Sequence, residues 1–202
     1  MITRLLLVGT LVATFASCNP ITLTFSGTGL TGTLAANTFT DAPFTFVFTS
    51  DTTLLVHPSN FLVDLSTPSG TPGTFNINNG QFTGTFMDDQ AVFTHPASED
   101  DIGIWHYNCC DWLTKGDAAF ASFDLASNVS VSTGINSAII NSFFTTSGGA
   151  LGFTNVNVGS MTFTETVGAS AVPEPSTLVL LSLGVAGLLI GRARRNHRGK
   201  GD

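Results

Sequence analysis

The sequence predicts an all-β fold, a β-sandwich or a jelly roll, for residues 18–168. Many short segments in this region alternate apolar and polar residues, which is the period of a strand with one buried face. Glycine-rich turns separate these segments at roughly even spacing, and none of them has a convincing helical period. Seventeen phenylalanines among 202 residues supply core material and argue against disorder.

The first strands are the most clearly marked. Residues 21–26 alternate strictly, and a glycine-punctuated piece, residues 30–34, either forms a hairpin with them or continues them as one long strand with a bulge. Residues 40–43 predict a turn, because they end in Asp-Ala-Pro. Residues 44–49 follow as a core strand, with Phe44, Phe46 and Phe48 on one face.

The middle of the chain contains a hairpin and a loop. Residues 61–65 predict a strand, and 67–73 form a loop rich in proline and glycine. Asn78-Asn79-Gly80 between residues 74–77 and 81–86 is a strong hairpin signal. The remaining predicted strands are 91–93, 102–105, 118–125, 128–131, 139–144, 150–153 and 160–167, with a turn around 136–140.

The first 17 residues predict a secretory signal peptide. Arg4 supplies the positive charge, residues 5–15 the apolar segment, and Ala16 and Ser17 the small residues of a cleavage site. Ser17-Cys18 is also similar to a lipoprotein box, in which Cys18 would be acylated. Both interpretations predict export.

The last thirty residues predict a membrane address. Pro173-Glu174-Pro175 lies in a linker, residues 169–176, and cannot continue a helix or a sheet. Residues 177–191 form an uncharged transmembrane helix that is shorter than the about 17–20 apolar residues of a comfortable span. The basic tail, 192–202, stays in the cytoplasm by the positive-inside rule. Its arginines are Arg192, Arg194, Arg195 and Arg198.

This order of parts resembles the PEP-CTERM sorting signal of bacteria: Pro173-Glu174-Pro175, then a short transmembrane helix, then an arginine-rich end. The resemblance implies processing by exosortase, a membrane protease. The protein would be held in the inner membrane transiently and then reach the cell surface or the extracellular space of an exopolysaccharide-producing envelope. The β-domain more loosely resembles a recurrent domain type of PEP-CTERM proteins, which implies no particular activity.

The charge balance excludes one class of partner. Residues 20–168 contain twelve carboxylates and a single base, Lys115. Such a surface repels nucleic acid and anionic membranes. We therefore expect no nucleic-acid partner.

The stretch from His106 to Asp111, with His95 upstream, contains residue types that bind zinc or copper. Adjacent side chains on a strand point to opposite faces, so Cys109 and Cys110 could not easily converge on one ion. In an exported protein, a disulfide between these neighbours, a bond to another chain, or buried thiols are all favoured over a metal site.

Two acidic loops, Asp88-Asp89 and Glu99-Asp100-Asp101, carry carboxylates of the kind that bind calcium, although a solvated loop is the simpler interpretation. The chain has no Gly-x-Ser-x-Gly, His-Glu-x-x-His or phosphate-binding loop, and nothing marks a catalytic pair of carboxylates. We therefore predict no catalytic residues and no cofactor, with calcium as the alternative.

The favoured hypothesis is an exported, non-enzymatic surface or matrix protein. A calcium-assisted carbohydrate-binding module is the alternative, with Trp105, Tyr107 and Trp112 stacking on sugar rings. A secreted hydrolase is the least favoured.

Overall fold

The computed structural model describes residues 19–59, 62–66, 72–88, 90–95, 99–106, 111–138, 143–154, 158–169 and Gly184; for residues 58, 59, 62–66, 106, 111, 112 and 138 it describes the backbone alone. Residues 18–169 form one compact unit. The predicted signal peptide, sorting helix and basic tail lie outside the described residues. Among the residues that are described, no helix is both long enough and apolar enough to span a membrane.

The domain is all-β, and its described strands form two antiparallel sheets. The first sheet contains eight of these strands, in the order β10-β14-β1-β2-β5-β6, with β13 paired to β1 and β12 paired to β13. Their bounds are β1 Pro20–Leu34, β2 Asn37–Asp51, β5 Thr74–Ile77, β6 Phe82–Thr85, β10 Val129–Val131, β12 Phe143–Thr146, β13 Gly149–Phe153 and β14 Ser160–Val167.

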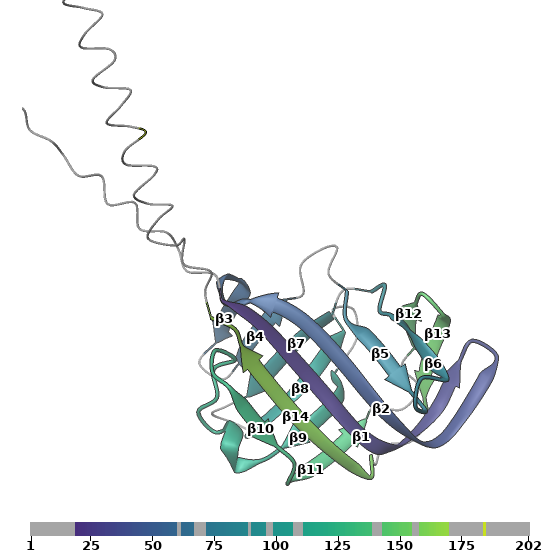
Figure 1. The fold of residues 1–202 in the computed structure, drawn as a ribbon. Helices are drawn as coiled ribbons and strands as arrows, with labels where there is room; N and C mark the ends of the chain where they lie inside the picture. The colour runs from purple at the N-terminus through teal and green to yellow at the C-terminus, as the bar shows by residue number, and fades with distance from the viewer. Residues whose placement is uncertain are drawn as a thin grey trace, which may run out of the picture. The chain divides into compact units, whose positions relative to one another are not determined.

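The second sheet contains the other six described strands, in the order β11-β9-β8-β7-β4-β3. Figure 1 shows its strands lying behind β1, β2 and β14 of the first sheet. Their bounds are β3 Leu55–Ser59, β4 Leu62–Ser66, β7 Gln90–His95, β8 Asp101–His106, β9 Asp111–Gly116 and β11 Ile135–Ala138; two short 3₁₀ helices, η1 Thr52–Leu54 and η2 Ala118–Phe120, lie outside the sheets.

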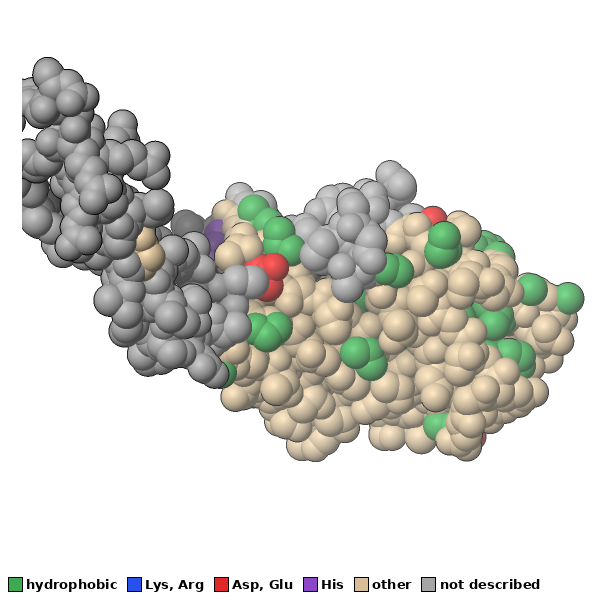
Figure 2. Space-filling view, turned by 45° about the horizontal axis from the view of Figure 1, so that its top comes forward, with side chains coloured by type: hydrophobic (Ala, Val, Ile, Leu, Met, Phe, Trp, Pro, Cys, Tyr) green, Lys and Arg blue, Asp and Glu red, His purple; other side chains and the backbone are tan. Residues whose placement is uncertain are grey.

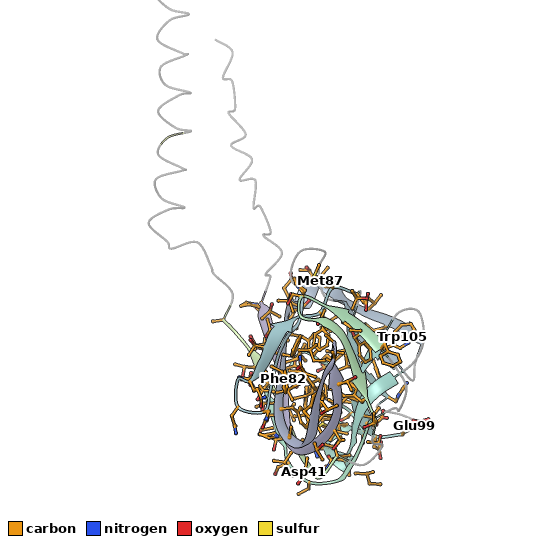
Figure 3. All side chains as sticks on the ribbon, turned by 90° about the vertical axis from the view of Figure 1, so that its right-hand side faces the viewer. Asp41, Phe82, Met87, Glu99 and Trp105 are labelled. Carbon is orange, nitrogen blue, oxygen red and sulfur yellow. The ribbon has the colours of Figure 1, made fainter. Side chains whose placement is uncertain are left out.

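Period-two alternation in the sequence becomes a buried face in the first sheet. Ile21, Leu23 and Phe25 of β1 are buried, and so are the alternating phenylalanines of β2. Ile104 of β8 and Leu113 of β9, in the second sheet, belong to the same hydrophobic cluster. Both sheets therefore contribute to one core, which Figure 3 shows filled with side chains.

Phenylalanine rings make up much of this core around Phe86. The Phe86 ring centroid lies 5.8 Å from those of Phe46 and Phe48, 5.5 Å from that of Phe75 and 6.4 Å from that of Phe144. Because Phe86 is fully buried, its side chain joins β2, β5 and β12 in one packed unit.

The predicted turn at residues 40–43 is wrong, because these residues lie inside β2. The hairpin turn is at residues 35–36, and β1 is one long strand with irregular pairing rather than a hairpin. Two bulges follow one another there on opposite strands, one in β1 containing Gly29 at φ 87° and one in β2 containing Asp41 at φ 50°. The Asp41 N–H donates to Thr31 Oγ1 at 3.0 Å, so the Asp-Ala-Pro sequence marks a bulge instead of a chain reversal.

The predicted strand at 118–125 is also wrong. This segment begins with η2, and the Asp117 carboxylate caps it by accepting a hydrogen bond of 2.9 Å from the Ala119 N–H. Its apolar residues, Phe120, Phe123 and Leu125, are buried in the core without forming a sheet ladder. The spacing of these apolar residues resembled a strand in the sequence because their side chains are buried, not because the backbone pairs in a sheet.

The sequence pattern does not predict strands β9 and β11 of the second sheet, and β11 occupies part of the turn expected at 136–140. The alternation of β9 is hidden because Lys115, a charged residue, takes an inward position. Of the predicted strand at 139–144, residues 139–142 lie outside the described residues, and β12 begins at Phe143.

Candidate functional site

A cluster of metal-ligating side chains lies at the loop end of the β7–β8 hairpin. His95 is the last residue of β7 and Asp101 the first of β8, and the antiparallel register makes them direct cross-strand partners. His95 Nδ1 and Asp101 Oδ1 are 2.8 Å apart, and the two side chains are 22% and 14% exposed. The pair is therefore partly shielded while still reachable from solvent.

Glu99 completes the cluster. One ligand atom each of His95, Glu99 and Asp101 lies within 4.8 Å of the other two. The carbonyl oxygen of His95 accepts hydrogen bonds from the N–H groups of Glu99 at 3.4 Å and Asp100 at 3.0 Å. These bonds hold Glu99 and Asp100 against the last residue of β7, while the Glu99 side chain is exposed at the edge of the domain (Figure 3).

Opposing influences act on the pKa of Asp101 in this cluster. Burial raises the pKa of Asp101; the hydrogen bond and charge of His95 oppose this shift, and the charge of Glu99 adds to it. Asp117 lies beside the cluster in space, because its N–H donates a hydrogen bond of 2.8 Å to the carbonyl oxygen of Asp100. The hydrogen bond from Thr133, followed by that from Ala119, holds the pKa of Asp117 below its ordinary value.

Lys115, the one base between residues 20 and 168, does not neutralise the acidic surface, because its side chain is fully buried. Its Nζ donates hydrogen bonds to the Thr133 carbonyl oxygen and, at 3.0 Å, to Asn136 Oδ1. Burial lowers the pKa of Lys115, and Asp117 opposes that shift. We interpret Lys115 as a structural residue that joins β9 to β11 and to the segment before it.

Glu165 is a second buried ionisable group, and sequence reasoning missed it. It lies on β14 opposite Leu23 of β1 and Val129 of β10, and its side chain is 1% exposed. Neither carboxyl oxygen has a hydrogen-bond partner among the described residues. Burial, and to a smaller extent the charge of Asp124, raises the pKa of Glu165 to about 8. The carboxyl is therefore mostly protonated at pH 7.

The two predicted acidic loops have different roles. Asp88 Oδ2 accepts a hydrogen bond of 2.5 Å from the Thr145 N–H of β12, so it anchors a strand; Asp89 lies outside the described residues. Of the second loop, Glu99 and Asp101 join the cluster with His95. The sequence contained a signal for this grouping, since a histidine and an aspartate that flank a short hairpin connection face each other across it.

Several predicted site residues lie outside the described part of the chain. They include both members of the possible disulfide, the possible lipidation site, the sorting motif and the membrane-stop arginines. Trp105 is half-buried, whereas the Tyr107 and Trp112 side chains are not described. The residues concerned are Cys18, Cys109, Cys110, Pro173, Glu174, Pro175, Arg192, Arg194, Arg195 and Arg198.

The described residues on the face shown in Figure 2 are mostly uncharged. On the face shown in Figure 2, polar side chains and backbone predominate, and hydrophobic side chains are scattered rather than gathered. Among the described residues, the exposed large hydrophobic side chains come from separate parts of the chain: Val56, Met87, Ile135 and Phe143.

Residues 171–195 match the family model of the PEP-CTERM protein-sorting motif. The chain is a PEP-CTERM domain-containing protein. The match confirms the resemblance based on Pro173-Glu174-Pro175, and the motif marks this PEP-CTERM protein as an exosortase target that is exported through a transient membrane stage toward the cell surface or extracellular space. No curated protein and no solved structure matches the chain.

Proposed function

We propose that this PEP-CTERM protein is a non-enzymatic component of the bacterial surface or extracellular matrix, associated with exopolysaccharide. The observation that carries the proposal is the sorting motif at residues 171–195. The composition of the domain supports it, because few charges and many threonines, serines and glycines suit a solvated extracellular β-protein.

The proposal includes the parts of the chain outside the described residues. Residues 1–17 act as a signal peptide, residues 177–191 cross the membrane, and the arginines of residues 192–202 hold the chain there until exosortase cuts near Pro173-Glu174-Pro175. The released part is the all-β domain, which we propose to be a two-layer sandwich because both sheets contribute to one core.

Two epitopes test the processing. One is inserted at the exposed turn between Asn79 and Gly80, and the other follows Lys200. In an exosortase-positive host, the first epitope should appear outside the cell without the second. A host lacking exosortase, and a chain with Pro173, Glu174 and Pro175 all replaced by alanine, should retain both epitopes on one membrane-bound species. If the unaltered chain retains both epitopes in the exosortase-positive host, the proposed processing is wrong.

A second experiment tests the matrix association. The released domain is fractionated from a host that makes its exopolysaccharide and from an otherwise identical host that cannot. The proposal predicts that the domain sediments with the polymer in the first host and stays in the soluble medium in the second. Equal distribution in both hosts would remove the polysaccharide from the proposal without affecting the sorting.

A further inference from the structure

We propose that His95, Glu99 and Asp101 bind a divalent transition-metal ion of the zinc class at the end of the β7–β8 hairpin. This site differs from the one considered in the sequence, which grouped His95 with Cys109 and Cys110. The register of β7 and β8 places His95 beside Asp101 instead. The proposal stands independently of the sorting mechanism.

The distances permit such a site. In tetrahedral zinc sites each nitrogen or oxygen donor lies about 2.0–2.1 Å from the metal, which places donors about 3.3 Å from one another. The three donor atoms here lie within 4.8 Å of one another, and the His95–Asp101 pair is already at 2.8 Å. Binding therefore requires the His95–Asp101 pair to open from 2.8 Å to about 3.3 Å, with loss of the proton that they share, and Glu99, whose exposed side chain can rotate, to move closer.

The donor chemistry selects the class of metal. Calcium takes oxygen donors, whereas zinc and its neighbours combine imidazole nitrogen with carboxylate oxygen. The carboxylates of Glu99-Asp100-Asp101 alone suit calcium, which was the alternative to a solvated loop, but the nitrogen of His95 changes the preference. Three protein donors leave a fourth tetrahedral position for water or for an oxygen donor from another molecule.

The charge around the cluster gives a reason for a cation. The His95–Asp101 hydrogen bond accounts for two of the three groups, but it leaves Glu99 close to a second carboxylate of the same charge. Lys115 is buried and hydrogen-bonded to Thr133 and Asn136, so it does not compensate these acids. A divalent ion would compensate both carboxylates at once.

The test is a zinc titration of the full-length chain, purified in detergent with its thiols alkylated by iodoacetamide so that cysteines cannot bind metal. Isothermal calorimetry with Zn²⁺ should give one site per chain, and Zn²⁺ should raise the thermal unfolding temperature. Ca²⁺ at the same concentration should do neither. The variants are His95→Ala, Glu99→Gln and Asp101→Asn, with His57→Ala, an exposed histidine of β3, as the matched control.

The expected result is loss of the site in His95→Ala, at least tenfold weaker binding in Glu99→Gln and Asp101→Asn, and unchanged binding in His57→Ala. Glu99→Gln keeps the test decisive if another variant fails to fold, because the exposed Glu99 side chain can be replaced without disturbing the core. Absence of zinc binding, or equal binding by the unaltered chain and Glu99→Gln, would overturn the proposal. A hydrogen-bonded His95–Asp101 pair without a metal would then be the correct description.

Discussion

The buried carboxyl of Glu165 predicts that raising the pH destabilises the domain. An ordinary glutamate has a pKa of 4.5, whereas burial raises the pKa of Glu165 in the folded protein to about 8. Between these values the folded state holds a proton that the unfolded state has released. Unfolding therefore becomes more favourable as the pH rises from 4.5 to 8, and the effect levels off above pH 8.

The size of the effect follows from proton linkage. Each pH unit well inside this range lowers the free energy of unfolding by about 1.4 kcal/mol. For a folded pKa of about 8 and an unfolded value of 4.5, the total loss at pH 7 is about 3 kcal/mol, most of it between pH 5 and pH 7. This is a large share of the 5–15 kcal/mol that typically stabilises a domain.

This loss of stability can be measured by urea unfolding, followed by tryptophan fluorescence. The unaltered protein and Glu165→Gln are compared at pH 5, 6, 7 and 8. The glutamine side chain of the variant cannot ionise, so the difference between the two proteins cancels the titration of every other group. We expect the unaltered protein to lose about 2–3 kcal/mol relative to the variant between pH 5 and pH 7. Glu165→Met, which also removes the unpartnered polar atoms, should be the more stable protein at pH 7.

A constant difference between the unaltered protein and Glu165→Gln across this pH range would refute the reasoning. It would mean that the Glu165 carboxyl has the same proton affinity in the folded and unfolded states, and therefore a partner or water in the core. An infrared carbonyl band of a protonated carboxylic acid at pH 7, absent from the glutamine variant, is the independent check.

Three further predictions concern stability and use the same urea assay. Phe86→Ala removes the ring at the centre of the aromatic core and should lower the free energy of unfolding by about 3–5 kcal/mol, whereas Phe143→Ala, at an exposed site, should change it little. Lys115→Ala leaves the oxygens of Thr133 and Asn136 without their donor and should lower it by about 2–4 kcal/mol, more than Lys115→Met, which preserves the packing. Gly80→Ala meets no atom within 4 Å but must adopt φ 91°, so a loss of about 1 kcal/mol is expected, and Gly80→Asn should lose less.

Local chemistry determined those features that the sequence could predict by itself. Alternation made the strands around Phe25 and Phe46 visible, since a residue's neighbours two positions away share its face. Asn78-Asn79-Gly80 predicted its hairpin because these residues tolerate positive φ, and all three adopt it. The sorting motif was equally readable, because a short linear segment carries it and no folding is needed to assemble it.

Tertiary structure decided which charged groups are buried and which of them meet. Lys115 and Glu165 were counted with the surface charges, although alternation places them on the faces of Leu113 and Phe163, and the packed core buries both side chains. The register of β7 and β8 brings His95 to Asp101, and the loop then returns Glu99 to the pair. Register between strands is set by the packing of the whole core, so a single strand's sequence does not contain it. For that reason the chain's destination could be read from its residues, while the grouping of its candidate metal site required the fold.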